Sequence, residues 1–356
     1  MAPLPTDDSG DSGDSGDLGL STDRSAGRPR PRWTVVIATI VAVLLVAEVG
    51  ARVLGTRLDD PDWNVAEVAA HIDNLDRLDA ESEQVDTLLI GSSSIGAAVD
   101  PASLAEQIEG VEVAYNANLF GPSAQAVEQV TDELLLQRLD PEVMVIGVTS
   151  RELNDNSADQ ARMLTALETS VGWRRLTGES SPYDRLDDSA GSISALVRFR
   201  PLLRDPETLA RRVVDGPGSP ISEFGMLTSR DGQRFDANNA DHNDQERSAL
   251  SDYAIGGEQL ESLERVVTTQ IDTGRRVVLV NMPVVDDLWW SLHPDPEGDR
   301  AAYEAAIAEL VAMTGVEYFD AASEFDHTTA DFGDANHLNE IGADRFTTVL
   351  ADHLAG

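Results

Sequence analysis

The chain has 356 residues, of which 64 are acidic and 26 are basic, and its formal net charge is −38. All the basic residues are arginine, and cysteine is absent. The charge argues against nucleic acid as a partner, because nucleic-acid binding needs a basic surface. Without cysteine or lysine, the chain has no disulfide, thiolate nucleophile, cysteine-ligated zinc, Schiff base or Ser–Lys mechanism.

Residues 1–32 have low sequence complexity, with a repeated Asp-Ser-Gly unit followed by arginines among prolines. Segments of this composition cannot bury enough apolar surface to fold. We therefore predict a disordered tail with no fold of its own.

Residues 33–54 form an apolar segment of about the ~20 residues that a spanning helix needs. Four arginines lie within residues 24–32, so the positive-inside rule places the N-terminus in the cytoplasm and the later residues outside. A cleavable signal peptide is the alternative, with 49–51 as a weak cleavage site. The long tail before the segment favours a retained anchor.

Residues 55–85 are predicted to form a stalk and a first helix, because apolar residues recur at helical spacing between 65 and 78. His71 falls on the apolar face of this helix. We expect it to be a packed core histidine rather than a ligand.

From residue 86 onwards, short apolar segments alternate with helical patterns. This rhythm predicts a parallel sheet covered on both faces. The expected fold class is α/β, a three-layer α/β/α domain (86–356) of about five parallel strands, preceded by the single transmembrane helix. The expected strands are 87–90, 111–115, 143–148, 276–280 and 316–319, with helices near 102–109, 123–138, 257–273 and 297–313.

Residues 151–256 interrupt this rhythm and are too many for a simple loop. We interpret them as an insertion with helices near 157–169, 192–203 and 205–214. A hairpin is predicted around Asp231-Gly232. Such an insertion is placed to overhang the carboxyl edge of the sheet and shape a substrate pocket.

The first expected strand ends in Gly91-Ser92-Ser93-Ser94. Glycine permits a sharp turn there, because it alone adopts unusual backbone angles at no steric cost. A serine on this turn would face the crevice at the carboxyl end of the strand, where open α/β sheets keep their sites. The alternative is an ordinary polar loop between a strand and a helix.

Near the C-terminus, Asp334-Ala335-Asn336-His337 precedes a helical pattern over 340–354. At this spacing a carboxylate can fold back onto its own imidazole. A serine nucleophile needs a base, and the base needs a group that orients it. No other histidine combines a carboxylate three residues earlier with a helix that would place it at the sheet edge. His242 has metal-ligand character but is expected on a solvated loop.

This order of motifs resembles the SGNH (GDSL-like) hydrolase superfamily, over roughly 86–150 and 275–354. The resemblance implies that Ser93 is the nucleophile, with Ser92 in the place of the usual aspartate; Ser92 and Ser94 are alternatives in register. It implies that His337 is the base and that Asp334 orients it.

The same resemblance implies an oxyanion hole formed by the backbone N–H of Ser93 and by Gly121. The third family motif, Gly-x-Asn-Asp, is not matched, because Thr149 stands where asparagine is expected. Asn154 is a possible displaced substitute. The adjacent Trp289 and Trp290 are interpreted either as half-buried packing or as a platform for stacking sugars.

The resemblance implies a membrane-anchored, extracytoplasmic serine esterase or O-acyltransferase without metal or cofactor. The enzyme would act on acyl esters of cell-envelope glycans through an acyl-Ser93 intermediate, with a membrane acyl-transfer protein as a further partner. The alternative is a degenerate SGNH-like scaffold of envelope machinery. Residues 55–356 hold 57 acidic and 21 basic residues, so a polyanionic glycan is a poor electrostatic match unless cations bridge it.

Overall fold

The computed structural model describes residues 32–55, 58, 61–204, 209–210, 213, 221–227 and 240–356. The chain divides into two compact units, residues 1–47 and 48–356. Helix α1 (Arg32–Gly55) confirms the helix expected over 33–54. It is long and apolar enough to cross a membrane, by length and composition.

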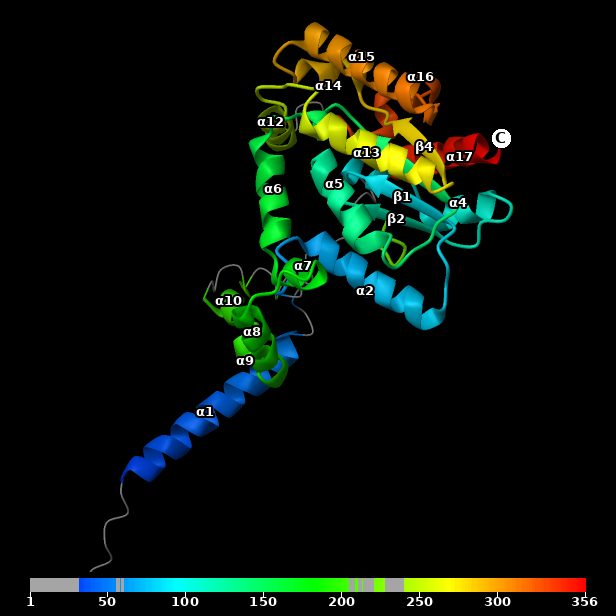
Figure 1. Ribbon diagram of the computed structural model, residues 1–356. Helices are drawn as coiled ribbons and strands as arrows, with labels where there is room; N and C mark the ends of the chain where they lie inside the picture. Colours follow the sequence, from blue (N-terminus) through cyan, green and yellow to red (C-terminus); the bar gives the residue numbers. More distant parts are fainter. Residues whose placement is uncertain are drawn as a thin grey trace, which may run out of the picture. The chain divides into compact units, whose positions relative to one another are not determined.

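The second unit contains a sheet of five parallel strands in the order β2-β1-β3-β4-β5. Strands β1, β2 and β4 are labelled in Figure 1. The α/β class and the number of strands are therefore confirmed. The bounds of the strands are β1 (Thr87–Gly91), β2 (Ala114–Asn118), β3 (Val143–Val148), β4 (Arg276–Asn281) and β5 (Glu317–Phe319).

The prediction for β2 was wrong by three residues, because the strand starts at Ala114 rather than at 111. Its second half carries two buried asparagines, which an apolar pattern excludes. Tertiary hydrogen bonds satisfy their amide N–H groups: the Asn116 side chain donates to the Ile95 carbonyl, and that of Asn118 to the Gly225 carbonyl. Within the described residues, the Oδ1 atoms of both asparagines have no hydrogen-bond partner.

The helices between the strands begin where the sequence predicts them. Asp100 caps α4 (Pro101–Gln107), and Ser123 caps α5 (Ala124–Val130). The helix expected over 123–138 is shorter, because α5 gives way to a π-helical turn over Thr131–Leu135. The other long helices are α2 (Ala66–Glu81), α13 (Glu258–Asp272), α15 (Pro296–Thr314) and α17 (Glu340–Ala355).

Two apolar clusters pack against the sheet. Leu88 and Ile90 belong to one cluster, which includes side chains of α2, α5, α13 and α15. Leu89 belongs to the other, with side chains of α4 and α17. Since successive residues of a strand point to opposite faces, both faces of β1 are covered.

The described part of the insertion is helical. It contains α6 (Ala158–Thr169), α7 (Val171–Leu176), α8 (Pro182–Ile193), α9 (Ala195–Arg198), α10 (Arg200–Leu203) and α12 (Ala240–Ala249). The single helix predicted over 192–203 is wrong, because Ser194 is extended and caps a new helix there. The predicted hairpin around Asp231-Gly232 and most of 205–214 lie outside the described residues.

Candidate active site

Ser93 is the first residue of the short helix α3 (Ser93–Ala98), directly after β1. Gly91 makes the turn possible: its φ is +144°, and a side chain there would collide with the Gly147 carbonyl of β3. The Ser92 hydroxyl accepts a hydrogen bond from the Ser94 amide and caps the helix. Ser93 is therefore held on a rigid turn at the carboxyl edge of the sheet.

The structure brings Ser93, His337 and Asp334 into one hydrogen-bonded line. His337 Nε2 lies 2.8 Å from Ser93 Oγ, and His337 Nδ1 lies 2.9 Å from both Asp334 carboxylate oxygens. The backbone amides of Asn336 and His337 also donate to Asp334 Oδ1, at 3.1 and 2.8 Å. Because the carboxylate is fixed by its own loop, the imidazole is held with Nε2 toward the serine.

The charges of this line support each other. Burial acts to lower the pKa of His337, but the charge and hydrogen bond of Asp334 outweigh it, so this pKa is raised above 6.5. Burial acts to raise the pKa of Asp334, yet the interactions with His337 and His242 lower it to about 2. Asp334 is therefore ionised at neutral pH and stabilises a protonated His337.

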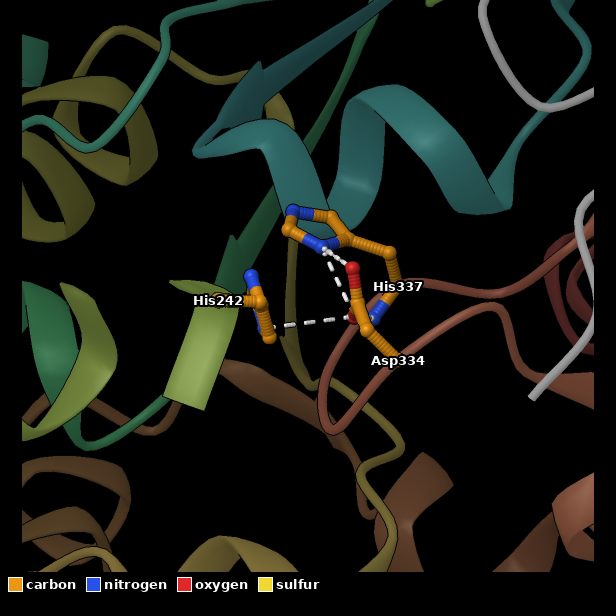
Figure 2. A group of neighbouring side chains, drawn as sticks. All are labelled: His242, Asp334 and His337. Atoms are coloured by element: carbon orange, nitrogen blue, oxygen red, sulfur yellow. Dashed lines mark hydrogen bonds and ion pairs between the residues drawn. The ribbon is translucent and has the colours of Figure 1, made fainter. Parts of the chain in front are cut away.

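Helix α12 of the insertion supplies a second histidine beside the carboxylate (Figure 2). His242 Nε2 lies 3.1 Å from Asn336 Oδ1 and 3.5 Å from Asp334 Oδ1, and its ring meets the His337 ring edge to face. The expectation of a solvated loop for His242 was wrong. The Asp-His-Asn-Asp sequence around His242 does not indicate the contact with Asn336, because the two residues are 94 positions apart.

Three of these side chains form a possible metal-binding group. One ligand atom from each of His242, Asp334 and His337 lies within 4.8 Å of the others. Two imidazoles and a carboxylate suit zinc, which binds such ligands at about 2.0–2.2 Å. A metal that took His337 Nδ1 would replace its hydrogen bond to Asp334. Metal binding and the serine–histidine–aspartate line are therefore competing states of the same residues.

Two of the expected oxyanion donors, Thr149 and Asn154, are engaged elsewhere. Gly121 has φ +62°, and a Cβ at this position would lie 2.8 Å from the Arg151 guanidinium. Thr149 directs both its amide and its hydroxyl at Glu152 Oε2, at 2.7 and 2.6 Å. The Asn154 side chain donates to the carbonyls of Ala249 and Ser251. Neither Thr149 nor Asn154 thus presents its side-chain donor to Ser93.

An ion pair next to Gly121 was not anticipated from the sequence. Arg151 follows β3, and its Nη1 lies 3.3 Å from Glu246 Oε1 of α12, with both side chains buried. Within the described residues, Arg151 Nε and Glu246 Oε2 have no hydrogen-bond partner. Among the smaller influences on the pKa of His337, the charge of Glu246 raises it and that of Arg151 lowers it. His242 and Glu246 are four residues apart, so one face of α12 covers the site.

A second serine–histidine pair lies after β3 and does not qualify as a reaction centre. Ser150 Oγ lies 2.9 Å from His293 Nε2, and His293 Nδ1 lies 3.6 Å from Asp299. Ser150 is only 1% exposed, and the Trp289 indole donates to its hydroxyl. Burial lowers the pKa of His293 to about 4 despite Asp299. Both side chains are buried, so a substrate cannot reach them.

The remaining candidates have structural roles. His71 is buried between the Tyr115 hydroxyl and the Asn118 carbonyl, as expected for a core histidine. Trp289 is fully buried, and Trp290 is half-buried, with the Arg300 guanidinium over its ring. These contacts support the packing interpretation of the two tryptophans.

No family model matches the chain, and no curated protein matches it significantly.

Proposed function

We propose that the chain is a membrane-anchored, extracytoplasmic serine esterase or O-acyltransferase with a three-layer, SGNH-like α/β/α domain. The observation that carries the proposal is the line from Ser93 Oγ through His337 to Asp334, with distances of 2.8 and 2.9 Å. The two apolar clusters on opposite faces of β1 support the three layers.

In the proposed reaction, Ser93 Oγ attacks the carbonyl carbon of an ester while its proton passes to His337 Nε2. Asp334 stabilises the resulting imidazolium. When the tetrahedral intermediate collapses, the ester C–O bond breaks and His337 returns the proton to the leaving alcohol. Water or a sugar hydroxyl then attacks the carbonyl carbon of acyl-Ser93 and gives its proton to His337 Nε2. The bond between the acyl carbon and Ser93 Oγ breaks, and His337 returns the proton to Ser93 Oγ. These residues are the same for hydrolysis and for transfer.

The oxyanion would be stabilised by the backbone amides of Ser93 and Gly121. Arg151 supports them in this proposal, because its buried guanidinium adjoins Gly121 and retains an unpaired Nε–H. In this proposal Arg151 has the role of the third oxyanion donor, for which the sequence suggested Thr149 or Asn154.

Acyl esters of cell-envelope glycans are the proposed substrates, since a membrane anchor would hold the domain near them. Helix α1 supports this placement by its length and its apolar composition. The acidic surface favours neutral or cation-bridged glycans.

A degenerate scaffold is the second candidate. It is favoured by one observation: both Thr149 donors are engaged by Glu152, so the third family donor is missing.

A fluorophosphonate probe separates the two candidates. On the first proposal it labels Ser93 of the purified full chain, and Ser93→Ala abolishes labelling. Ser94→Ala is the matched control, because its hydroxyl lies on the same helix turn but is not bonded to His337. A folded wild-type protein that stays unlabelled would leave the scaffold as the better account.

A further inference from the structure

The exposed apolar side chains of the second unit are concentrated in one segment of the insertion. Outside α1, seven large hydrophobic residues are exposed among the described residues, and five lie between 176 and 203. Three of these belong to α8: Tyr183, Leu186 and Ile193 are 69, 72 and 76% exposed. Clustered exposure of this degree marks an interaction surface.

These three side chains form one stripe. At 100° per residue, positions 183, 186 and 193, with Ala190, fall within an arc of about 80°. Two carboxylates elsewhere on the helix are neutralised, because Asp184 pairs with Arg174 and Asp187 with Arg200. Helix α8 therefore has an apolar face, and the charges of Asp184 and Asp187 on the same helix are both paired with arginines.

The end of α8 is bonded to the final turns of α1. The Glu48 carboxylate accepts hydrogen bonds from the amides of Ala195 and Leu196 and from the Ser194 hydroxyl. The Arg52 guanidinium donates to the Ile193 carbonyl at 2.8 Å. Helices α8, α9 and α10 pack as a group (Figure 1). This group of helices is therefore bonded to Glu48 and Arg52, which follow the charge-free part of α1.

The charge-free part of α1 is short for a bilayer. It runs from residue 33 to 47, which is about 22 Å of helix at ~1.5 Å per residue. The hydrocarbon core is about 30 Å thick. In a spanning helix Glu48 would therefore lie at or below the outer interface. Its carboxylate tolerates that depth because Arg52, Ser194 and two amides satisfy it.

We propose that α8 is an interfacial helix whose Tyr183, Leu186 and Ile193 side chains insert into the outer leaflet of the membrane. The inference rests on the proposed anchoring of α1. The occupant of the stripe is lipid, because the bonds of Glu48 and Arg52 hold the end of α8 at the level of the bilayer surface.

The absence of cysteine makes the test direct. A nitroxide is attached to Leu186→Cys or Ile193→Cys in the full-length chain, reconstituted in phosphatidylcholine–phosphatidylglycerol vesicles. Power-saturation EPR then compares collisions with oxygen, which concentrates in lipid, and with a water-soluble nickel complex. Met313→Cys is the aqueous control, since Met313 is exposed on α15, and Val43→Cys is the control for the anchor.

The expected result is loss of nickel accessibility with retained oxygen accessibility at 186 and 193, as at 43, and the opposite at 313. Nickel accessibility at both 186 and 193 equal to that at 313 overturns the interfacial helix. Protection from both reagents also overturns it, because protein then covers the stripe. If position 43 is open to nickel, the anchor itself fails, whereas protection at 43 alone refutes only the inference about α8.

Discussion

Replacing Asp334 by asparagine tests how the candidate active site works. The pKa of Asp334 falls from 3.8 to about 2 although burial opposes the shift, which corresponds to roughly 2 kcal/mol in favour of the ionised form. His337 makes the largest favourable contribution to this shift, and the same ion pair raises the pKa of His337. Loss of the carboxylate should slow attack by Ser93 about 30-fold. Loss of the correct imidazole tautomer can extend the effect to about 10⁴-fold.

The assay is the second-order rate of fluorophosphonate labelling at Ser93, measured as a function of pH. In the wild type, labelling should fall as pH drops through the raised pKa of His337, because the protonated base cannot accept a proton. In Asp334→Asn the carboxylate that raises the pKa of His337 is gone, so the midpoint of the pH–labelling curve should move to lower pH. Asp344→Asn, at an exposed position of α17, is the control. An unchanged rate and midpoint in folded Asp334→Asn would refute the reasoning.

Three further predictions follow from the same contacts. Arg151→Met or Glu246→Met alone should destabilise the domain by about 3–5 kcal/mol, because each leaves a buried charge unpaired, and the double variant should recover much of this loss in thermal melts; additive losses would contradict the coupling. Zinc should slow fluorophosphonate labelling of Ser93 by competing for His337, and EDTA should reverse this inhibition. In His242→Gln the inhibition by zinc should be weaker. Equal inhibition of the wild type and His242→Gln would count against a role for His242. The lowered pKa of Asp334 stabilises the fold above about pH 4, and this contribution is lost toward pH 2. The unfolding free energy of the wild type should therefore fall more steeply over this interval than that of Asp334→Asn. Parallel acid denaturation curves would show that the carboxylate adds no folding stability.

Local sequence patterns determined much of the framework. Apolar runs, Asp and Ser caps and the glycine that ends β1 are short-range features, and they predicted the five parallel strands and most helices between them. The spacing of Asp334 and His337 also needs only four residues to place a carboxylate against an imidazole. Ser93 was found for the same reason, because a serine after a strand-ending glycine is a local motif.

Tertiary structure decided the rest. The β2 strand continues to Asn118 alongside β1, and the amide groups of its buried asparagines donate to the Ile95 and Gly225 carbonyls, which an apolar pattern cannot encode. Arg151 and Glu246 read as surface charges in sequence, and burial becomes possible only when α12 brings the two together. His242 likewise reaches Asp334 across the fold rather than along the chain. Contacts of this kind depend on how the insertion packs, and hydrophobic periodicity carries no information about which charged side chains will meet.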